Sequence, residues 1–377
     1  MSSPGSNSQE ERAKRYSSQK YALAIVDTAY TLVLLFIFLA TGLSRALAQN
    51  LEKSYSGNLL LVPLYFAIIL FGYYLLSLPL NFYNSHVLEH KFSLSRQKIR
   101  DWLLDQLKAG IISYVIGLIL VAAFYYILKT NPASWWLIVS LFWIFLSLVL
   151  AKLTPVLIIP LFFKYKKLSD ESLRERIMNL AQKMKVRILD VFEIDFSKKT
   201  LKANAAFVGI GKTRRVLLAD TLKDKYTHDE IEVILAHEFS HYKLKHLLKL
   251  VLVNSAVTIL IFYIIFKTSN FSLGVFGFSS LSELAALPVV FMYFFIFGLI
   301  TQPFGAYISR RLEKNADMMA LEITGLKSAF ISTMDKLARQ NLADRKPHPV
   351  IKFFFFDHPP IDERINMAKN TQEGRQA

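Results

Sequence analysis

The stretch SWWLIVSLFWIFLSLVLAKLTPVLIIPLF, residues 134–162, decides the class of fold to which this chain belongs. Its only charged side chain is Lys152, and its apolar side chains leave no polar face on a helix. The stretch also exceeds the roughly 20 residues that a helix needs to cross the hydrocarbon core of a bilayer. It therefore predicts a membrane-spanning helix rather than a buried helix of a soluble core.

The rest of the chain carries further apolar blocks of the same kind, about six in all. Hydrophobic residues make up 53% of the sequence and charged residues only 20%, which is too apolar for an ordinary soluble enzyme. The fold class that we predict is mainly α, a multi-pass helical membrane protein. The blocks are residues 21–45, 58–83, 109–128, 134–162, 247–267 and 285–306.

The distribution of charge predicts which side of the membrane each polar segment faces. The formal net charge is +16, but no basic stripe interleaved with aromatic residues lies outside the apolar blocks, so a nucleic acid partner is not expected. Lys and Arg gather in the N-terminal tail, in the loop 91–100 and after Lys164, whereas the intervening loops hold little beyond Lys53 and Lys129. By the positive-inside rule, the termini and long polar segments face the cytoplasm, across the plasma membrane of a prokaryote or the endoplasmic reticulum of a eukaryote.

The apolar blocks divide the chain into alternating membrane and polar segments. The polar start lacks the layout of a cleavable signal peptide, so we expect the first block to stay as an anchor. The sequence has no cysteine, which excludes disulfides and cysteine catalysis. The predicted organisation is a disordered cytoplasmic tail (1–20), spans one to four (21–164), a soluble insert (165–246), spans five and six (247–306) and cytoplasmic helices that complete the site (307–377).

The soluble insert has the pattern of a small α+β unit. Residues 170–184 have helical periodicity, and three short runs between turn formers predict strands. Thr227 and Glu230 form a T-x-x-E capping box, which predicts the start of a helix that runs through IEVILAHEFSHYKLKH. The three strand runs are RILDVFEID (187–195), NAAFVGIG (204–211) and RRVLLAD (214–220).

The helix predicted after Thr227 carries the sequence H-E-F-S-H. His237 and His241 lie about 40° apart around a helix, so both imidazoles can reach one Zn²⁺ ion from the same face. Glu238 lies beside them and is suited to take a proton from a zinc-bound water. A pair of helix histidines that make ordinary hydrogen bonds is the less favoured alternative. The motif therefore predicts a zinc hydrolase site.

A third metal ligand has to come from elsewhere in the chain. His246 points about 180° away from His237 on a continuous helix, so we interpret it as structural or as a support for a ligand. The sixth span returns to the cytoplasm just before SRRLEKNADMMALEITG, where Glu313 is the nearest acid and Glu322 the next candidate. Asp317, one turn after Glu313, could hold a ligand histidine by its free N–H. A solvated charge remains an equal alternative for Glu313.

Three motifs together resemble the integral-membrane CAAX prenyl endopeptidases. They are HEFSHYKLKH (237–246), EKNAD (313–317) and DHPPIDERI (357–365), in that order and at that spacing. The resemblance extends through LPLNFYNSHVLEHKFSLS, TPVLIIPLFFKYKKL and ANAAFVGIGKTRRVLLADTLK, and so covers nearly the whole chain from about residue 15. It implies a gluzincin-type α+β protease domain at the cytoplasmic end of helices that enclose a water-filled chamber.

The resemblance also implies roles for individual residues. His237, His241 and Glu313 would hold one Zn²⁺ per chain, Glu238 would be the base and Asp317 would support a ligand. The substrate would be a peptide or protein, in some cases lipidated, with no nucleic acid or nucleotide partner. Near an edge strand the substrate main chain would meet Asn204, Ala205, Ala206 and Phe207, and His358 and Arg364 would approach the reaction centre.

The chain departs from the family pattern in two places. Eukaryotic members have one more N-terminal span, and they carry N-A-Y-F where this chain has N-A-A-F, so Ala206 replaces an aromatic residue. The missing aromatic ring leaves the subsite preference open. In a prokaryote, where prenylated CAAX proteins are not expected, the natural substrate would differ.

Two other classes of function fit parts of the sequence. Residues 206–213, AFVGIGKT, are close to a phosphate-binding loop of a nucleotide-driven transporter, but the run that follows predicts a strand, whereas such a loop opens a helix. A non-catalytic membrane scaffold with a structural zinc site would need four protein ligands and no base. Three ligands beside Glu238 favour a peptidase over both.

Overall fold

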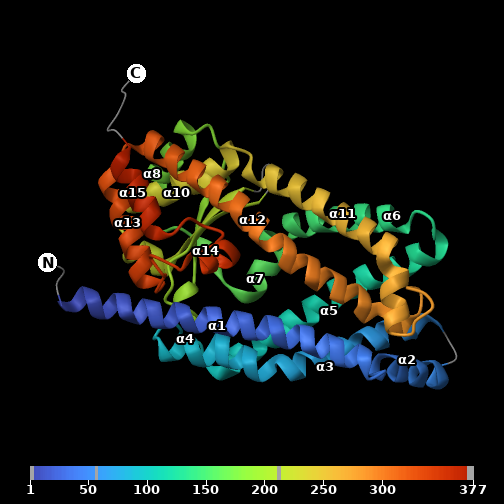
Figure 1. The fold of residues 1–377 in the computed structure, drawn as a ribbon. Helices are drawn as coiled ribbons and strands as arrows, with labels where there is room; N and C mark the ends of the chain where they lie inside the picture. The colour runs from blue at the N-terminus through green and yellow to red at the C-terminus, as the bar shows by residue number, and fades with distance from the viewer. Residues whose placement is uncertain (1–3, 56–57, 210–213, 372–377) are drawn as a thin grey trace.

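The computed structural model describes residues 4–55, 58–209 and 214–371 of the chain. Long helices occupy one part of the molecule, and a unit of shorter helices with a small sheet lies at one end of them (Figure 1). Within the described residues, six helical segments are long and apolar enough to cross a membrane, as predicted. Their main helices are α1 (Pro4–Ala40), α3 (Asn58–Phe82), α5 (Ile99–Thr130), α6 (Trp135–Leu153), α11 (His246–Val275) and α12 (Leu287–Thr324).

The long helices expose apolar side chains instead of burying them. Only 6% to 33% of the most apolar window of each span is buried inside the protein. Phe71, Phe145 and Ile300 are 63%, 62% and 64% exposed. Such surfaces are stable in lipid, where helices also satisfy every backbone hydrogen bond internally. The chain is therefore an integral, multi-pass membrane protein.

Two of the spans continue through a π-helical turn into a short α-helix. Helix α3 runs into η1 (Tyr83–Val87) and α4 (Leu88–Lys91), and α6 runs into η2 (Thr154–Ile158) and α7 (Ile159–Phe162).

An apolar cavity of about 520 Å³ lies among the spans, with Phe66, Phe124 and Trp143 in its wall. The larger water-filled chamber stays a prediction. After Gly42, in the left-handed conformation at φ 74°, the amphipathic α2 (Leu43–Ser54) follows α1.

The prediction of a disordered tail over residues 1–20 is wrong from Pro4 onward, because α1 begins there. The Tyr16 hydroxyl donates a hydrogen bond to Glu89 Oε1 at 2.6 Å, and Lys20 and Lys202 form ion pairs with the same carboxylate at 2.7 and 2.9 Å. A polar composition argues against a segment with a core of its own. Here the segment extends α1, the helix of the first span, so its ordering needs no separate helix nucleation.

A four-stranded sheet in the order β1-β2-β4-β3 supports the soluble unit. Strands β2 and β4 are parallel, and β1 and β3 run antiparallel to their neighbours. Each of the three predicted runs contains a strand, β2, β3 and β4 in order, and residues 210 and 211 of the second run lie outside the described residues. Strand β1 lies in the basic start of the insert and was not predicted. The strands are β1 (Tyr165–Lys167), β2 (Val191–Ile194), β3 (Ala205–Val208) and β4 (Arg215–Ala219).

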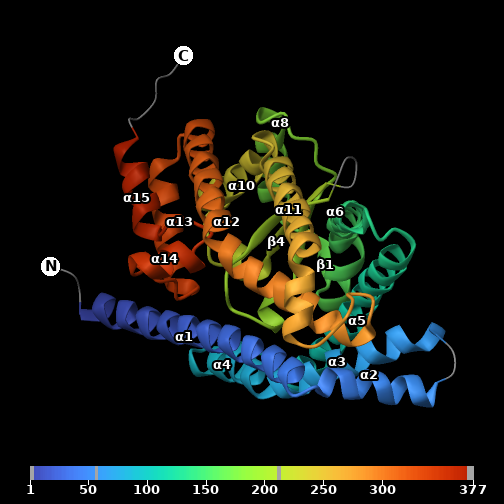
Figure 2. The ribbon, with the colours of Figure 1, turned by 45° about the vertical axis from the view of Figure 1, so that its right-hand side comes forward.

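Helices cover this sheet and join it to the last span (Figure 2). Helix α10 begins after Thr227 with the predicted capping box, and Ile231, Leu235 and Phe239 bury one of its faces in the core that holds the sheet. The predicted helix at 170–184 is confirmed as α8. The helices are α8 (Glu171–Lys183), α9 (Asp220–Lys223), α10 (His228–Lys243), α13 (Lys327–Gln340), α14 (Pro349–Phe355) and α15 (Ile361–Asn370).

Asp190, directly before β2, links the sheet to α8 through its carboxylate. Its carboxylate, only 5% exposed, accepts hydrogen bonds from Arg174 Nε and the Val191 backbone N–H, both at 2.8 Å, and lies 3.2 Å from Lys167 Nζ. The Arg174 hydrogen bond lowers the pKa of Asp190 from its ordinary value of 3.8 to about 2. The ionised carboxylate is thus favoured in the folded state.

We expect Asp190→Asn to lower the free energy of unfolding by about 1–2 kcal/mol at neutral pH. Because the folded-state pKa is depressed, the carboxylate stabilises the fold above its unfolded pKa of about 3.9 and loses this effect as the pH falls towards about 2. Thermal unfolding in detergent should show a wild-type advantage at pH 7 that shrinks below about pH 4. An advantage that grows on acidification would contradict this assignment.

Candidate active site

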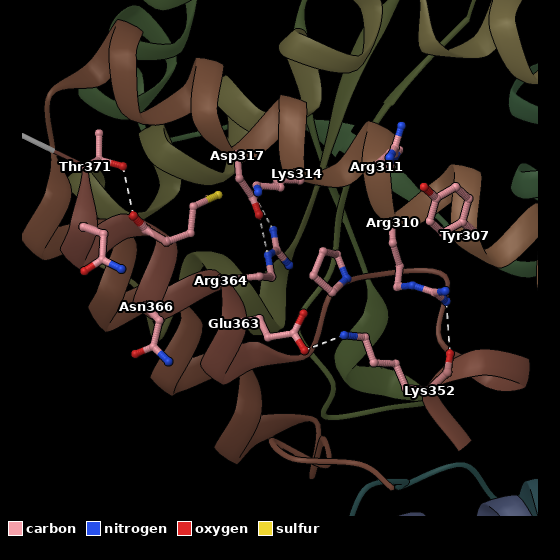
Figure 3. A pocket seen from close by; sticks show the side chains of 13 residues that line it. Tyr307, Arg310, Arg311, Lys314, Asp317, Lys352, Glu363, Arg364, Asn366 and Thr371 are labelled. Carbon is pink, nitrogen blue, oxygen red and sulfur yellow. Dashed lines mark hydrogen bonds and ion pairs between the residues drawn. The ribbon is translucent and has the colours of Figure 1, made fainter. Parts of the chain in front are cut away.

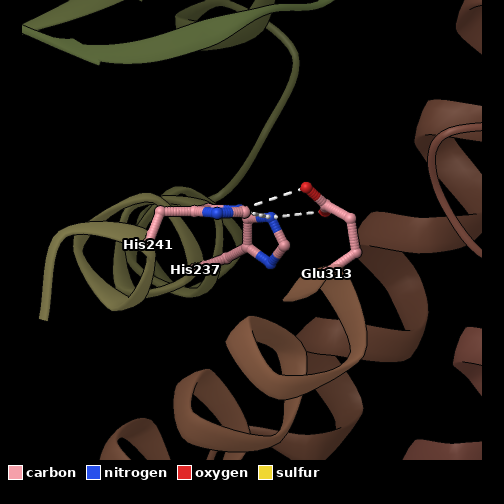
Figure 4. Close-up of side chains that lie close together, drawn as sticks. All are labelled: His237, His241 and Glu313. Carbon is pink, nitrogen blue, oxygen red and sulfur yellow. Dashed lines mark hydrogen bonds and ion pairs between the residues drawn. The ribbon is translucent and has the colours of Figure 1, made fainter. Parts of the chain in front are cut away.

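Three side chains from two helices converge on one point (Figure 4). The Nε2 atoms of His237 and His241 are 3.0 Å apart, and they lie 3.1 and 3.3 Å from the two carboxylate oxygens of Glu313. One donor atom from each of these residues lies within 4.8 Å of the others, so the group could hold a single metal ion. The predicted trio of ligand residues is therefore assembled, although their binding role stays a prediction.

Helix geometry places the two histidines, and helix packing places the carboxylate. His237 and His241 lie one turn apart on α10 and share a face. Glu313 lies on α12 beyond its apolar part, where this helix packs along α10. The next candidate, Glu322, is exposed on α12 and is not part of the cluster. The packing therefore brings Glu313, and not Glu322, beside the two histidines.

A buried pair of charges fixes the orientation of His237. Asp317 is fully buried, and its Oδ1 lies 2.8 Å from His237 Nδ1. Arg364, on α15, donates two hydrogen bonds to the same carboxylate, from Nε at 2.7 Å and from Nη2 at 2.5 Å. An unpaired buried carboxylate would be costly, and the arginine offsets that cost. A proton on Nδ1, facing this carboxylate, would leave the Nε2 lone pair directed at the cluster.

This arrangement of donors fits a metal ion. His237 Nε2 faces a second imidazole nitrogen and the Glu313 carboxylate, and Glu313 Oε2 is buried without a hydrogen-bond donor among the described residues. Lone pairs that face one another repel unless a cation lies between them. Two imidazoles and one carboxylate are a ligand set that zinc accepts, with a fourth position open to water.

Glu238 and His358 flank the cluster. Glu238 is half-buried on α10, and burial raises the pKa of its carboxyl group above the ordinary value, which favours a group that can exchange a proton. His358 lies in the loop before α15, with Nε2 3.4 Å from Glu313 Oε2 and Nδ1 2.8 Å from Asp357 Oδ1. The Asp357 carboxylate raises the pKa of His358. A protonated imidazole at this place could donate to an anion.

The predicted helix through residue 246 is wrong, and this changes the position of His246. Helix α10 ends at Lys243, Lys245 has a left-handed φ of 55°, and α11 begins at His246. The turn brings His246 Nδ1 to 3.0 Å from His241 Nδ1, so the 180° separation expected for a continuous helix does not apply. His246 is buried behind a candidate ligand, which agrees with a supporting role.

Of the residues predicted to bind substrate, Ala205, Ala206 and Phe207 lie on β3, and Asn204 directly precedes this strand. This strand is one of the two edge strands of the sheet, and its Phe207 ring packs against Phe239 and Tyr242 of α10. Asn204 is exposed directly before the strand, and Ala205 and Ala206 are half-buried within it. The placement is compatible with strand addition by an extended peptide, which stays a prediction.

Sequence reasoning missed three parts of this arrangement. The contact of His246 with His241 depends on a left-handed lysine, for which the sequence offers no glycine or asparagine as a signal. The pairing of Asp357 with His358 could have been suspected from adjacency alone. The bond between Arg364 and Asp317 joins residues on α15 and α12, and no local pattern announces it.

Two family models together cover almost the whole chain. One, described as CAAX prenyl protease N-terminal, five membrane helices, matches residues 5–164, and one described as peptidase family M48 matches residues 167–372. The chain belongs to peptidase family M48. The predicted kinship with the CAAX prenyl endopeptidases is confirmed, and this M48 peptidase is a membrane metalloprotease.

Relatives of this M48 peptidase occur in bacteria and eukaryotes. An uncharacterized metalloprotease, YhfN of Bacillus subtilis, is 29% identical over 364 residues, which cover 96% of this chain and 85% of the relative. CAAX prenyl protease 1 of Saccharomyces cerevisiae is 28% identical over 320 residues, 79% of this chain and 70% of the relative. The crystal structure of S. mikatae Ste24p has the same fold, with a TM-score of 0.85 at 24% identity over 95% of this chain and 88% of that one.

We expect Asp317→Asn to weaken metal binding by about 10–100-fold, because the amide no longer supports the His237 imidazole as a carboxylate does. Titration of the metal-depleted protein against a competing chelator measures the affinity. Glu322→Gln is the matched control, an equally conservative change of an exposed acid on the same helix. An unchanged metal affinity in a folded Asp317→Asn protein would remove Asp317 from this role.

Proposed function

We propose that this metalloprotease is a zinc endopeptidase that cleaves peptide bonds near the C-terminus of CAAX-type or other membrane-associated substrates. The observation that carries the proposal is the convergence of His237, His241 and Glu313 beside Glu238, at the end of a membrane-spanning helix. Several relatives are named CAAX prenyl proteases, which supports this class of substrate. A non-catalytic scaffold is disfavoured, because the chain belongs to a family of peptidases.

His237, His241 and Glu313 would hold one Zn²⁺, which supplies a water of lowered pKa and polarises the scissile carbonyl. Glu238 would take the proton of the attacking water and pass it to the leaving amine. His358, with its pKa raised by Asp357, would donate a hydrogen bond to the oxyanion that forms on the substrate. Asp317 and Arg364 would keep His237 in the required tautomer.

The substrate would lie extended along β3 as an additional strand. This strand is one of the two edge strands of the sheet, so its free side can pair with a peptide backbone, and the exposed Asn204 at its start can contact the substrate main chain. Lipidated and unlipidated peptides both fit this mode. We place the site on the cytoplasmic face, because basic residues dominate the segments on its side of the membrane.

A nucleotide-driven transport function has little support. Of the loop-like stretch 206–213, residues 210–213 lie outside the described part of the chain. The described residues that follow enter β4 at Arg215, whereas a phosphate-binding loop leads into a helix. The arrangement favours a β-hairpin in the protease unit.

We expect Glu238→Gln to bind the metal as well as the wild type does and to cleave about 10²–10⁴ times more slowly, because the amide cannot accept the water proton. The measurement combines metal content with cleavage of a quenched fluorescent CAAX-type peptide in detergent. Glu232→Gln, on the same helix and away from the cluster, is the matched control. Undiminished cleavage by a Glu238→Gln protein would exclude Glu238 as the base.

We expect Asn204→Ala to raise KM about five- to tenfold with little change in kcat, because one substrate hydrogen bond is lost in the bound and transition states alike. Steady-state kinetics with the same peptide separates the two parameters. Asn179→Ala on α8 is the control. A fall in kcat at constant KM would contradict a role in substrate binding.

A further inference from the structure

Helix α14 presents apolar side chains that no part of the described chain covers. Val350, Phe353 and Phe354 are 56%, 52% and 39% exposed, although the helix belongs to the segment predicted to lie wholly in the cytoplasm. Exposed aromatic side chains grouped on a short helix are unusual in water. They are usual on helices that lie in the interface of a bilayer.

Contacts with two spans place α14 at the level of the membrane boundary. Gln302 Nε2 of α12 donates to the Phe354 carbonyl at 2.9 Å, one turn or less from Ile300 and Phe304, which are 64% and 56% exposed in the apolar part of α12. Tyr21 packs against Phe355 with ring centroids 6.2 Å apart, at the start of the apolar part of α1. The end of α14 therefore lies beside the apolar part of α12 at Phe354 and beside α1 at Phe355.

A basic pocket lies next to α14, on the side towards α15 (Figure 3). It has a volume of about 590 Å³, and Tyr307, an aromatic residue of the kind found at bilayer interfaces, lies in its wall. Figure 3 shows Arg310 reaching from α12 to the backbone carbonyl of Lys352. The charged residues in the wall are Arg310, Arg311, Lys314, Lys352 and Arg364 on the basic side, and Asp317 and Glu363 on the acidic side.

Ion pairs inside the pocket neutralise only two of the basic residues. Arg364 pairs with Asp317, and Lys352 Nζ lies 2.5 Å from Glu363 Oε1. Arg311 packs over the Tyr307 ring at 4.9 Å, and neither it nor Lys314 has a carboxylate of the described residues within 4.0 Å. Both side chains are exposed. The pocket therefore keeps an excess of positive charge beside Lys352 of α14, which directly precedes the exposed Phe353 and Phe354.

We propose that α14 and this pocket form a binding site for an anionic phospholipid of the membrane in which the protein lies. The headgroup phosphate binds to Arg311 and Lys314, and the acyl chains pass over Phe353 and Phe354. Guanidinium and ammonium groups bind phosphate oxygens strongly, and basic residues at the cytoplasmic surface attract anionic lipids. A freely diffusing anion would use the basic groups but would gain nothing from the exposed phenylalanines.

The site has a consequence for the enzyme, because α14 leads directly into the loop that carries His358. Arg310 Nη1 donates hydrogen bonds to two backbone carbonyls, that of Lys352 within α14 and that of Phe356 directly after α14. A lipid that holds α14 against α12 would thus also hold the His358 loop beside Glu313.

The depth of α14 can be measured because the chain has no native cysteine. A nitroxide spin label on Phe354→Cys in lipid nanodiscs should be accessible to oxygen and protected from a water-soluble nickel complex, as a label on Ile300→Cys is. A label on Lys369→Cys, on α15, provides the aqueous reference. A Phe354→Cys label as accessible to nickel as the aqueous reference would overturn the proposal.

The headgroup site can be tested by native mass spectrometry of the detergent-solubilised protein. We expect the wild type to retain phosphatidylglycerol in preference to phosphatidylcholine, and Arg311→Gln/Lys314→Gln to bind it at least about tenfold more weakly. Lys98→Gln/Arg100→Gln, with the same loss of charge at exposed positions of another cytoplasmic segment, should bind like the wild type.

Three outcomes would overturn the headgroup site. Equal retention by the Arg311→Gln/Lys314→Gln and wild-type proteins would place the lipid elsewhere. Equal loss in both double variants would indicate a general effect of charge. Binding of inorganic phosphate at these residues without retention of phosphatidylglycerol would assign the pocket to a free anion.

Discussion

The packing of α12 along α10 is the contact on which the site depends. A helix with its histidines one turn apart presents two donor atoms, but the third donor and the carboxylate that orients the first histidine both come from α12. Asp317 can stay ionised in a fully buried position because Arg364 of α15 pairs with it. The pairing of Arg364 with Asp317 offsets the free-energy cost of this buried charge. The same pairing holds α15, and the loop before it that carries His358, beside the site.

The bilayer imposes the second constraint. Spans must be helical to satisfy their backbone hydrogen bonds, and α11 and α12 start or end within the protease unit, so the membrane part carries site residues on its own helices. The Tyr16, Lys20 and Lys202 contacts with Glu89 likewise join the first span to the residues just before β3. The protease unit is therefore held to the spans at several points rather than by a linker.

Apolar side chains are exposed on the membrane spans but buried in the protease unit. Phe145 on α6 needs no partner because lipid covers it, whereas Phe239 on α10 is buried in the core of the protease unit. The short helix α14 belongs by sequence to the polar segment but has the surface of the membrane part. Its contacts with Gln302 of α12 and Tyr21 of α1 join it to two of the spans.

The sequence by itself determined the spans, the strands β2 to β4 and the helix that carries His237, Glu238 and His241. These features depend on periodicity, block length and caps, which are local. Only the tertiary structure showed that Glu313 and not Glu322 lies beside the two histidines, ordered the first helix from Pro4 and brought His246 to His241. Those outcomes depend on how helices distant in the chain pack and on one left-handed turn, for which local patterns carry no information.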